Sequence, residues 1–363
     1  MIRRLAIAAA ALAAGLAATV VAAVPASAAD VFTPAVTVVA PPCTPAGSSD
    51  AAFGAGTVRG FASFDNCSHA IYYFEGGTQG YTRILTPYRG DVLGVDTDET
   101  ATYLVYLMTD AAGNASGIGV TKRMHGGGFA ATRVLSTHVG AVRPTADVSA
   151  EGGRWWAVWT EQVGETEFAP QQLFQAKTFG TGADHQQITF TGPGVDNTEP
   201  SISLDAVGAV MTWTRQTAPA QPGPADLWVA TNANTAWSSR VFSADGTFNG
   251  ASDVKRIGGV TFMAFVRDGR IVESENTPGT FVSHAFLQPG FGPKVGATAG
   301  SQFVAWSTGS RIFYARGNNG AQSFVGQFAS DLGTTLAGLV AANGKATVLV
   351  RSSNRIYSIT SSS

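Results

Sequence analysis

The sequence predicts an all-β protein, a seven-bladed β-propeller of four-stranded antiparallel blades. Seven strand endings recur along the chain, each with an apolar anchor residue: Phe64, Met108, Trp159, Trp213, Phe265, Trp306 and Val350. Successive anchors lie about 40 to 55 residues apart, which is the repeat length of a propeller blade. The composition agrees, because 43 glycines and only 13% charged residues favour short strands and tight turns.

The repeat around Trp159 illustrates the expected blade. Residues 145–152 form its inner strand, and residues 154–161, 172–179 and 185–192 form the next three. Trp155 and Trp156 are adjacent, which indicates a strand buried on both faces, as between neighbouring blades. Trp159, Trp213 and Trp306 share one repeat position, so we expect all three to lie in the core.

The two ends of the propeller predict how the ring closes. The last repeat, residues 336–363, supplies only three strands, whereas residues 31–41 read as a lone strand. Pairing these segments completes the seventh blade and removes exposed sheet edges. The alternative is a six-bladed ring in which the repeat around Phe64 forms an irregular cap.

Residues 1–29 predict a secretory signal peptide. Arg3 and Arg4 precede a long apolar run that ends in Ala-Ser-Ala-Ala, a pattern typical of signal peptidase sites. An N-terminal membrane anchor is the alternative reading. We expect a secreted, extracellular protein with no membrane span after cleavage and one propeller domain over residues 30–363. Cys43 and Cys67 are the only cysteines, and export to an oxidising compartment predicts that they form a disulfide.

The charge pattern limits the classes of partner. With 23 basic and 25 acidic residues and no basic cluster, the sequence argues against nucleic-acid binding. The five histidines are scattered, so we expect no metal site. We also expect a monomer without a cofactor. The run Asp-Thr-Asp-Glu from Asp96 is interpreted as a turn, with calcium binding as the alternative.

Several repeats join their third and fourth strands by a Gly/Asn-rich turn that ends in an aromatic residue. These turns are GGTQGY, HGGGF, NANTAW, NTPGTF and GNNGAQSF, ending at Tyr81, Phe129, Trp237, Phe281 and Phe324. They resemble the Asp-box (BNR) turn of sialidase-type propellers, S-x-D-x-G-x-x-W. The run TEPSISLDAVGAVMTWTR from Thr198 looks like the same superfamily.

The resemblance implies a propeller fold. Sialidase chemistry would also require three arginines around a carboxylate, a Tyr–Glu nucleophile pair and an acidic proton donor. The family's Arg-Ile-Pro signature is absent, and TRILTP around Arg83 is the nearest approach.

The sequence places a candidate ligand site at one end of the ring. The connections between second and third strands lengthen to TEQVGETEFAPQQ and TRQTAPAQPGPAD in two repeats, and long loops on a rigid scaffold often bind ligands. The inner strands begin at that end, which predicts a ring formed by Asp91, Arg143, Glu199, Asp253 and Lys294. A second ring follows the anchors, with Asp110, Glu161, Arg215 and Arg267. Mixed charges suit a polar, hydroxyl-rich ligand, although a solvated loop face would look the same.

Two functional classes follow. The first is a secreted propeller that binds a glycan or another cell-surface polymer. The second is a sialidase-like glycoside hydrolase or a polysaccharide lyase, for which Glu161 with Glu199 or Asp253 is the candidate carboxylate pair. Binding is the preferred hypothesis because it requires only a rigid site with dispersed polar groups. A structural or partner-binding role is the remaining possibility.

Overall fold

A computed structural model describes most of the chain after the N-terminal segment. The described residues are 36–39, 49–53, 59–64, 70–77, 80–110, 112–138, 144–164, 169–177, 185–217, 223–232, 237–277, 280–299, 301–309, 311–317, 322–327, 334–352 and 355–361. They form strands and turns and contain no helix. Consequently, no helix in the described part of the chain could cross a membrane.

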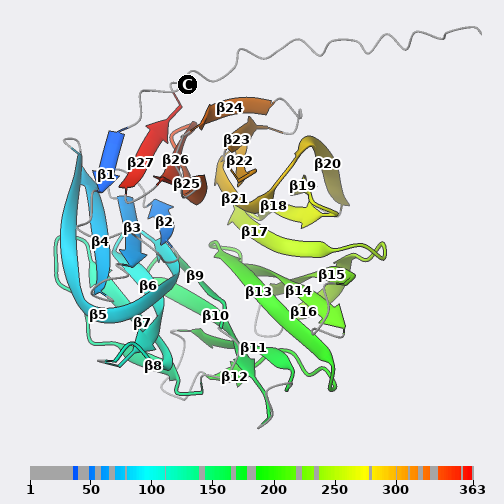
Figure 1. Ribbon diagram of the computed structural model, residues 1–363, viewed down its shortest axis with the longest axis horizontal. Coiled ribbons are helices and arrows are strands. Elements are labelled where there is room, and N and C mark those ends of the chain that lie inside the picture. The colour runs from blue at the N-terminus through cyan, green and yellow to red at the C-terminus, as the bar shows by residue number, and fades with distance from the viewer. Residues whose placement is uncertain are drawn as a thin grey trace, which may run out of the picture.

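The strands form six antiparallel sheets arranged around a central channel (Figure 1). In four of the sheets consecutive strands lie side by side, with the first strand innermost. These sheets are β9–β12 (Ala146–Glu151, Arg154–Gln162, Gln171–Lys177, Gln186–Gln187), β13–β16 (Val195–Leu204, Ala209–Thr217, Ala225–Asn232, Ser238–Ser243), β17–β20 (Asn249–Ile257, Val260–Arg267, Arg270–Thr277, Thr280–Pro289) and β21–β24 (Phe291–Thr298, Ser301–Ser307, Arg311–Arg316, Gln322–Gln327).

The largest sheet has seven strands and contains two sequence repeats. Its strands are β2 (Ser49–Phe53), β3 (Arg59–Phe64), β4 (Ala70–Gly77), β5 (Gly80–Thr97), β6 (Ala101–Thr109), β7 (Ala115–Met124) and β8 (Arg133–Ser136). β5 pairs with β4 up to Arg89 and with β6 from Gly90 onward, so it closes one four-stranded unit and opens the next. The strands thus form six sheets rather than seven separate ones, which matches the six-bladed alternative in number, but the repeat around Phe64 forms a four-stranded unit with β5 and is not an irregular cap. The sheets number six because β5 runs through two repeats without a break.

Gly90 lies at the point where β5 changes partner. Its φ is +132°, a conformation that L side chains rarely adopt, and a Cβ here would lie 1.6 Å from the carbonyl oxygen of Leu107. Only glycine can occupy this position without moving β6.

The ring closes as the sequence predicts. β25 (Thr334–Ala342), β26 (Lys345–Ser352) and β27 (Arg355–Thr360) form three strands of one sheet, and β1 (Val36–Val39) supplies the fourth. Val36 is paired with Ser358 and Thr37 with Tyr357, so strands from opposite ends of the sequence lie side by side (Figure 1).

Two-residue turns link several pairs of neighbouring strands. Asp268 and Gly269 link β18 to β19, and both have positive φ, at 46° and 71°. Asn343 and Gly344 do the same between β25 and β26, at 53° and 73°. Asp-Gly and Asn-Gly are the dipeptides that favour two-residue hairpin turns with this backbone geometry.

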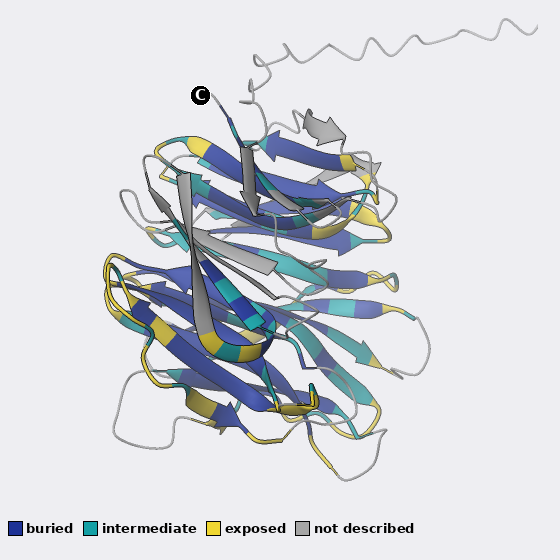
Figure 2. Ribbon diagram, turned by 60° about the vertical axis from the view of Figure 1, so that its left-hand side comes forward, coloured by how far each residue is buried: buried dark blue, intermediate teal, exposed yellow. Residues whose placement is uncertain are grey.

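The core lies between neighbouring sheets, and exposed residues concentrate at the turns (Figure 2). Trp159 and Trp306 are 0% exposed and Trp213 is 1% exposed, which confirms that the shared repeat position belongs to the core. Trp213 packs with Trp156 and Met211 between the β9–β12 and β13–β16 sheets. Fully burying side chains of this size is worth about 2 to 3 kcal/mol each, so the anchors are a main source of stability between sheets.

Candidate functional site

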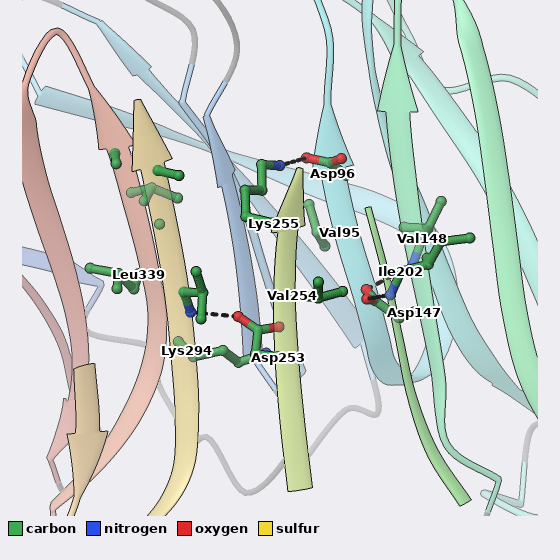
Figure 3. A pocket seen from close by; sticks show the side chains of 15 residues that line it. Val95, Asp96, Asp147, Val148, Ile202, Asp253, Val254, Lys255, Lys294 and Leu339 are labelled. Carbon is green, nitrogen blue, oxygen red and sulfur yellow. Dashed lines mark hydrogen bonds and ion pairs between the residues drawn. The ribbon is translucent and has the colours of Figure 1, made fainter. Parts of the chain in front are cut away.

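The central channel contains a pocket lined by the inner strands of five sheets and by β5. Its volume is about 80 Å³. Five charged side chains line it, from β5, β9, β17 and β21: Asp96, Asp147, Asp253, Lys255 and Lys294 (Figure 3). Aliphatic residues such as Val95, Ile202 and Leu339 form the rest of the wall. Asp253 and Lys294 were expected at the site from the sequence, whereas Asp96, Asp147 and Lys255 were missed.

The aspartates satisfy backbone groups of the adjacent sheet. An inner strand is the edge of its sheet, so some of its N–H groups have no partner in the strand ladder. Asp147 Oδ2 accepts a hydrogen bond from Ile202 N at 2.8 Å, and Asp253 Oδ2 accepts one from Val295 N at 2.6 Å. Asp96 Oδ2 likewise accepts from Ala150 N at 2.9 Å. Each carboxylate therefore joins two sheets, and its orientation in the channel is fixed.

Ser201 occupies the same repeat position in β13. Its Oγ accepts a hydrogen bond from Val254 N of the next sheet at 3.3 Å, just as each aspartate accepts one from a backbone N–H of the sheet next to its own. The same Oγ lies 3.1 Å from Asp147 Oδ2 and 3.2 Å from Asp253 Oδ1. Because a hydroxyl has one proton, Ser201 donates to one carboxylate at a time, which leaves acceptor capacity on the other.

Lys255 crosses the channel. Its Nζ lies 3.7 Å from Asp96 Oδ1 on the other side, so the pair links the β17–β20 sheet to β5 (Figure 3). The Asp96 carboxylate raises the pKa of the Lys255 ammonium above its usual value, and Asp253 and Asp147 add to this effect. Lys255 is therefore charged at neutral pH.

Glu199 belongs to a second set of bonds between sheets. Its φ is 52°, and its N–H donates to Thr145 Oγ1 at 3.1 Å. Its Oε2 accepts from Ala251 N at 2.9 Å and from Thr214 Oγ1 at 3.0 Å. Thr145, Glu199 and Ala251 thus form a chain of bonds across three sheets, near the start of each inner strand.

Glu161 lies in a buried cluster at the end of β10. It is 7% exposed, and its Oε1 accepts from Trp159 Nε1 at 2.7 Å. His185 Nε2 lies 3.0 Å from the same oxygen, and the imidazole stacks on Trp159 with centroids 5.5 Å apart. The cluster joins a carboxylate to a half-exposed histidine.

Arg215 and Arg267 occupy equivalent positions two residues after their anchors. Arg215 Nε donates to Asn197 Oδ1 at 2.9 Å, and its guanidinium carbon lies 3.7 Å from the centre of the Trp228 ring. Arg267 Nε donates to Asn249 Oδ1 at 3.2 Å. Both arginines lie against their own sheets.

The other predicted site residues are not among the side chains that line the pocket. Asp91 is half-buried on β5. Asp110 lies in an exposed turn, where hydrogen bonds from Asn114 and Ala112 lower the pKa of its carboxyl. Arg143, Cys43 and Cys67 lie outside the described residues.

The interpretation of Asp96–Glu99 as a turn is confirmed only for Asp98 and Glu99, because Asp96 and Thr97 are the last residues of β5. Asp98 Oδ1 accepts from Thr100 N and Ala101 N at 2.7 and 2.9 Å. Across the described residues, no group of three or more His, Cys, Asp or Glu side chains is arranged to hold a metal ion.

A repeat position in the sequence marks the pocket residues. Twelve residues before the anchor is where Asp96, Asp147, Ser201, Asp253 and Lys294 occur. The predicted ring of Asp91, Arg143, Glu199, Asp253 and Lys294 includes this position in only two repeats. This position identifies four of the five charged pocket residues, whereas Lys255 lies ten residues before Phe265.

Comparisons with known proteins support the fold. Neither a protein-family model nor a curated protein sequence matches the chain. Among solved structures, a puromycin hydrolase in complex with PGG matches with a TM-score of 0.55 and 15% identity, over 85% of this chain and 50% of that chain. This chain thus spans half the length of that hydrolase.

Two further structures match over most of both chains. The β-propeller domain of Cps50 (Swd1) from Myceliophteria thermophila has a TM-score of 0.55 at 9% identity, over 90% of this chain and 99% of that chain. YCF48 bound to D1 peptide has a TM-score of 0.51 at 10% identity, over 91% and 94%. The chain is therefore a β-propeller protein. This conclusion rests on the ring of sheets, on the closing pair β1–β27 and on these structural matches.

Proposed function

We propose that the protein is a secreted binding propeller that holds a polar, hydroxyl-rich ligand, a glycan, at the central channel and the loop face around it. The observation that carries this proposal is the convergence of Asp96, Asp147, Asp253, Lys255 and Lys294 on one pocket. Secretion rests on the signal-like residues 1–29.

The mixture of charges favours a neutral ligand with many hydroxyls. Carboxylates accept hydrogen bonds from hydroxyl groups, and ammonium groups donate to them. Bonds such as Ile202 N to Asp147 hold the carboxylates in place before a ligand arrives, which reduces the entropic cost of binding. A volume of about 80 Å³ accommodates an edge of one sugar ring, with the rest of the glycan on the surrounding loops.

The contacts of the candidate carboxylates favour binding over glycoside hydrolysis. Hydrolysis commonly uses one carboxylic acid as proton donor and a second carboxylate as nucleophile or base. Glu199 and Asp253 already accept backbone hydrogen bonds that join sheets. Glu161, beside His185, is the candidate whose position is most compatible with the alternative, a sialidase-like hydrolase or a polysaccharide lyase.

The test combines a glycan array with calorimetric titration of the glycans that bind. Lys294→Gln and Asp147→Asn should each weaken binding about tenfold, because each removes one charged partner of the ligand. Asp147→Asn keeps a carbonyl oxygen for Ile202 N and so preserves the bond between sheets. Arg311→Gln, at an exposed position on β23, is the matched control and should bind like the wild type.

Assays with sialoside and other glycoside reporters decide between the two classes. The absence of turnover alongside glycan binding supports the proposal. Turnover that disappears in Glu161→Gln would instead establish the hydrolase. Mass spectrometry of the exported protein should give an N-terminus at Asp30, and an uncleaved residue 1 would contradict the secretory part of the proposal.

A further inference from the structure

A second pocket lies between β5–β8 and the β9–β12 sheet, away from the channel. Its volume is about 180 Å³, and its wall includes Tyr103 on β6, Val120 and Lys122 on β7, Arg133 on β8 and Trp155 on β10. It lies where β6 begins and β7 approaches its end, so it is near the opposite end of the blades from the long second-to-third loops. It is therefore separate from the proposed glycan site.

The strand register brings these side chains to one face. Tyr103 is paired with Lys122, and Val120 with Arg133, so the members of each pair project from the same side of their sheet. Tyr103, Val120 and Trp155 belong to one buried cluster between the two sheets. The pocket thus has an apolar inner wall, with two cationic side chains at its exposed rim.

The inner wall is aromatic. The rings of Tyr103 and Trp155 have centroids 6.4 Å apart with an interplanar angle of 33°. Burial raises the pKa of Tyr103 to about 12, so the phenol is neutral at physiological pH. An apolar cavity of about 150 Å³ is known to accept benzene, so a volume of about 180 Å³ accommodates a six-membered aromatic ring.

The rim is positively charged. Lys122 and Arg133 are both exposed, and the guanidinium carbon of Arg133 lies 5.7 Å from the centre of the Trp155 ring. No acidic residue is among the described side chains that line the pocket. An anionic group at the rim would therefore meet two cations, while a flat ring attached to it would contact the aromatic wall.

We propose that this pocket binds a small aromatic carboxylate, with its ring against Tyr103 and Trp155 and its carboxylate between Lys122 and Arg133. A benzoate-sized molecule satisfies both halves of the pocket. A sugar acid fits less well, because its hydroxyl groups would face the apolar wall that Val120 and Trp155 form.

The experiment uses para-fluorobenzoate as the probe, followed by fluorine NMR on the full-length mature protein and by calorimetric titration. We expect saturable binding, and binding of the neutral para-fluorobenzamide about tenfold weaker because charge-assisted bonds are lost. Arg133→Gln and Lys122→Gln should each weaken para-fluorobenzoate binding about fivefold or more. Ala131→Phe adds a large side chain at an exposed position that lines the pocket, and should abolish binding without lowering Tm.

Arg311→Gln, on the distant β23, is the control that should leave the affinity unchanged. The proposal is overturned if para-fluorobenzoate does not bind, if the benzamide binds equally well, or if Ala131→Phe binds like the wild type. Binding of glucuronate in place of para-fluorobenzoate would also overturn it. Because Lys294 and Asp147 are not in this pocket, their variants should retain para-fluorobenzoate binding, which separates this test from that of the glycan site.

Discussion

The ammonium of Lys255 and the carboxylate of Asp96 lie 3.7 Å apart across the central channel, joining β17 to β5 (Figure 3). The sheets that carry them are not neighbours in the ring, since β9–β12 and β13–β16 lie between them. The ion pair therefore links two sheets across the channel. The hydrogen bonds from backbone N–H groups to Asp96, Asp147 and Asp253 instead link neighbouring sheets.

Lys255→Met tests the contribution of this ion pair. We expect a loss of about 1 kcal/mol, because a third of the Lys255 side chain remains exposed and water screens the pair. The folded-state pKa of Lys255 is raised, so its stabilising effect is complete below the unfolded-state pKa of about 10.5 and is lost as pH rises through the folded value. Urea unfolding at about pH 7 and pH 11 checks this, and an equal difference between wild type and variant at both pH values would contradict it.

The burial of the Glu273 carboxyl predicts a loss of folding stability in mild alkali. It is 1% exposed on β19, and neither carboxyl oxygen has a hydrogen-bond partner among the described residues. Burial, with a smaller effect of Glu275, raises the pKa of Glu273 to about 8. The unfolded chain releases this proton near pH 4.5, so folding becomes less favourable as pH rises from there through about 8.

Glu273→Gln should remove that dependence. Between about pH 6 and pH 9 the wild type should lose about 2 to 3 kcal/mol more than the variant. Glu99→Gln, at an exposed turn, is the control and should behave like the wild type. Chemical unfolding at several pH values provides the measurement, and parallel profiles for wild type and Glu273→Gln would show that the carboxyl is not protonated in the fold.

The hydrogen bonds of Asp98 predict a loss of stability in acid rather than in alkali. Burial alone would raise the pKa of its carboxyl, but hydrogen bonds from the N–H groups of Thr100, Ala101 and Gly153 together lower it. Its contribution is therefore present above the unfolded pKa of about 3.8 and is lost as pH falls through the folded value. Asp98→Ala should cost about 2 to 3 kcal/mol at neutral pH by leaving several donors unpaired. The neighbouring Glu99→Ala should be nearly neutral in the same thermal-unfolding experiment.

Replacing the buried amide of Asn197 should lower the stability of the fold substantially. It is 0% exposed, and its Oδ1 accepts from both Trp213 Nε1 and Arg215 Nε. Asn197→Ala leaves these donors unpaired and opens a small cavity, with an expected loss of about 2 to 4 kcal/mol. Calorimetric unfolding checks the value, and a loss no greater than that of Arg311→Gln would refute the role assigned to the amide.

The predicted disulfide between Cys43 and Cys67 is tested by mass spectrometry of the non-reduced, exported protein. Bridging the two should lower the mass by two hydrogens and stabilise the fold by about 3 kcal/mol in the chain-entropy model. Alkylation of both thiols without prior reduction would end this prediction.

The fold could be predicted largely because its signals are periodic. Trp159, Trp213 and Trp306 recur at one position, and the three-stranded last repeat calls for a strand from the other end of the chain. The continuity of β5 was missed because both of its halves have strand-forming sequences, and only the change of partner at Gly90 distinguishes them.

The site was harder to predict than the fold. A carboxylate that accepts from a backbone N–H more than 50 residues away, such as Asp147 from Ile202, leaves no local signature. The charged residues at the starts of the inner strands predicted a ligand site there, yet Glu199 bonds to the neighbouring sheet. The pocket beside Tyr103 and Trp155 could not be predicted from the sequence either, because it forms only where two sheets meet.

The pairing of β1 with β27 has a consequence for biogenesis. These strands are separated by almost the whole sequence, so their pairing has the largest loop-closure cost in the ring. The last sheet stays one strand short until both β1 and β27 are available, so a chain that is still being synthesised has an open sheet edge. The propeller therefore completes its final sheet only after β27 has been synthesised, and the short β1 segment protects the edge of that sheet from pairing with another copy.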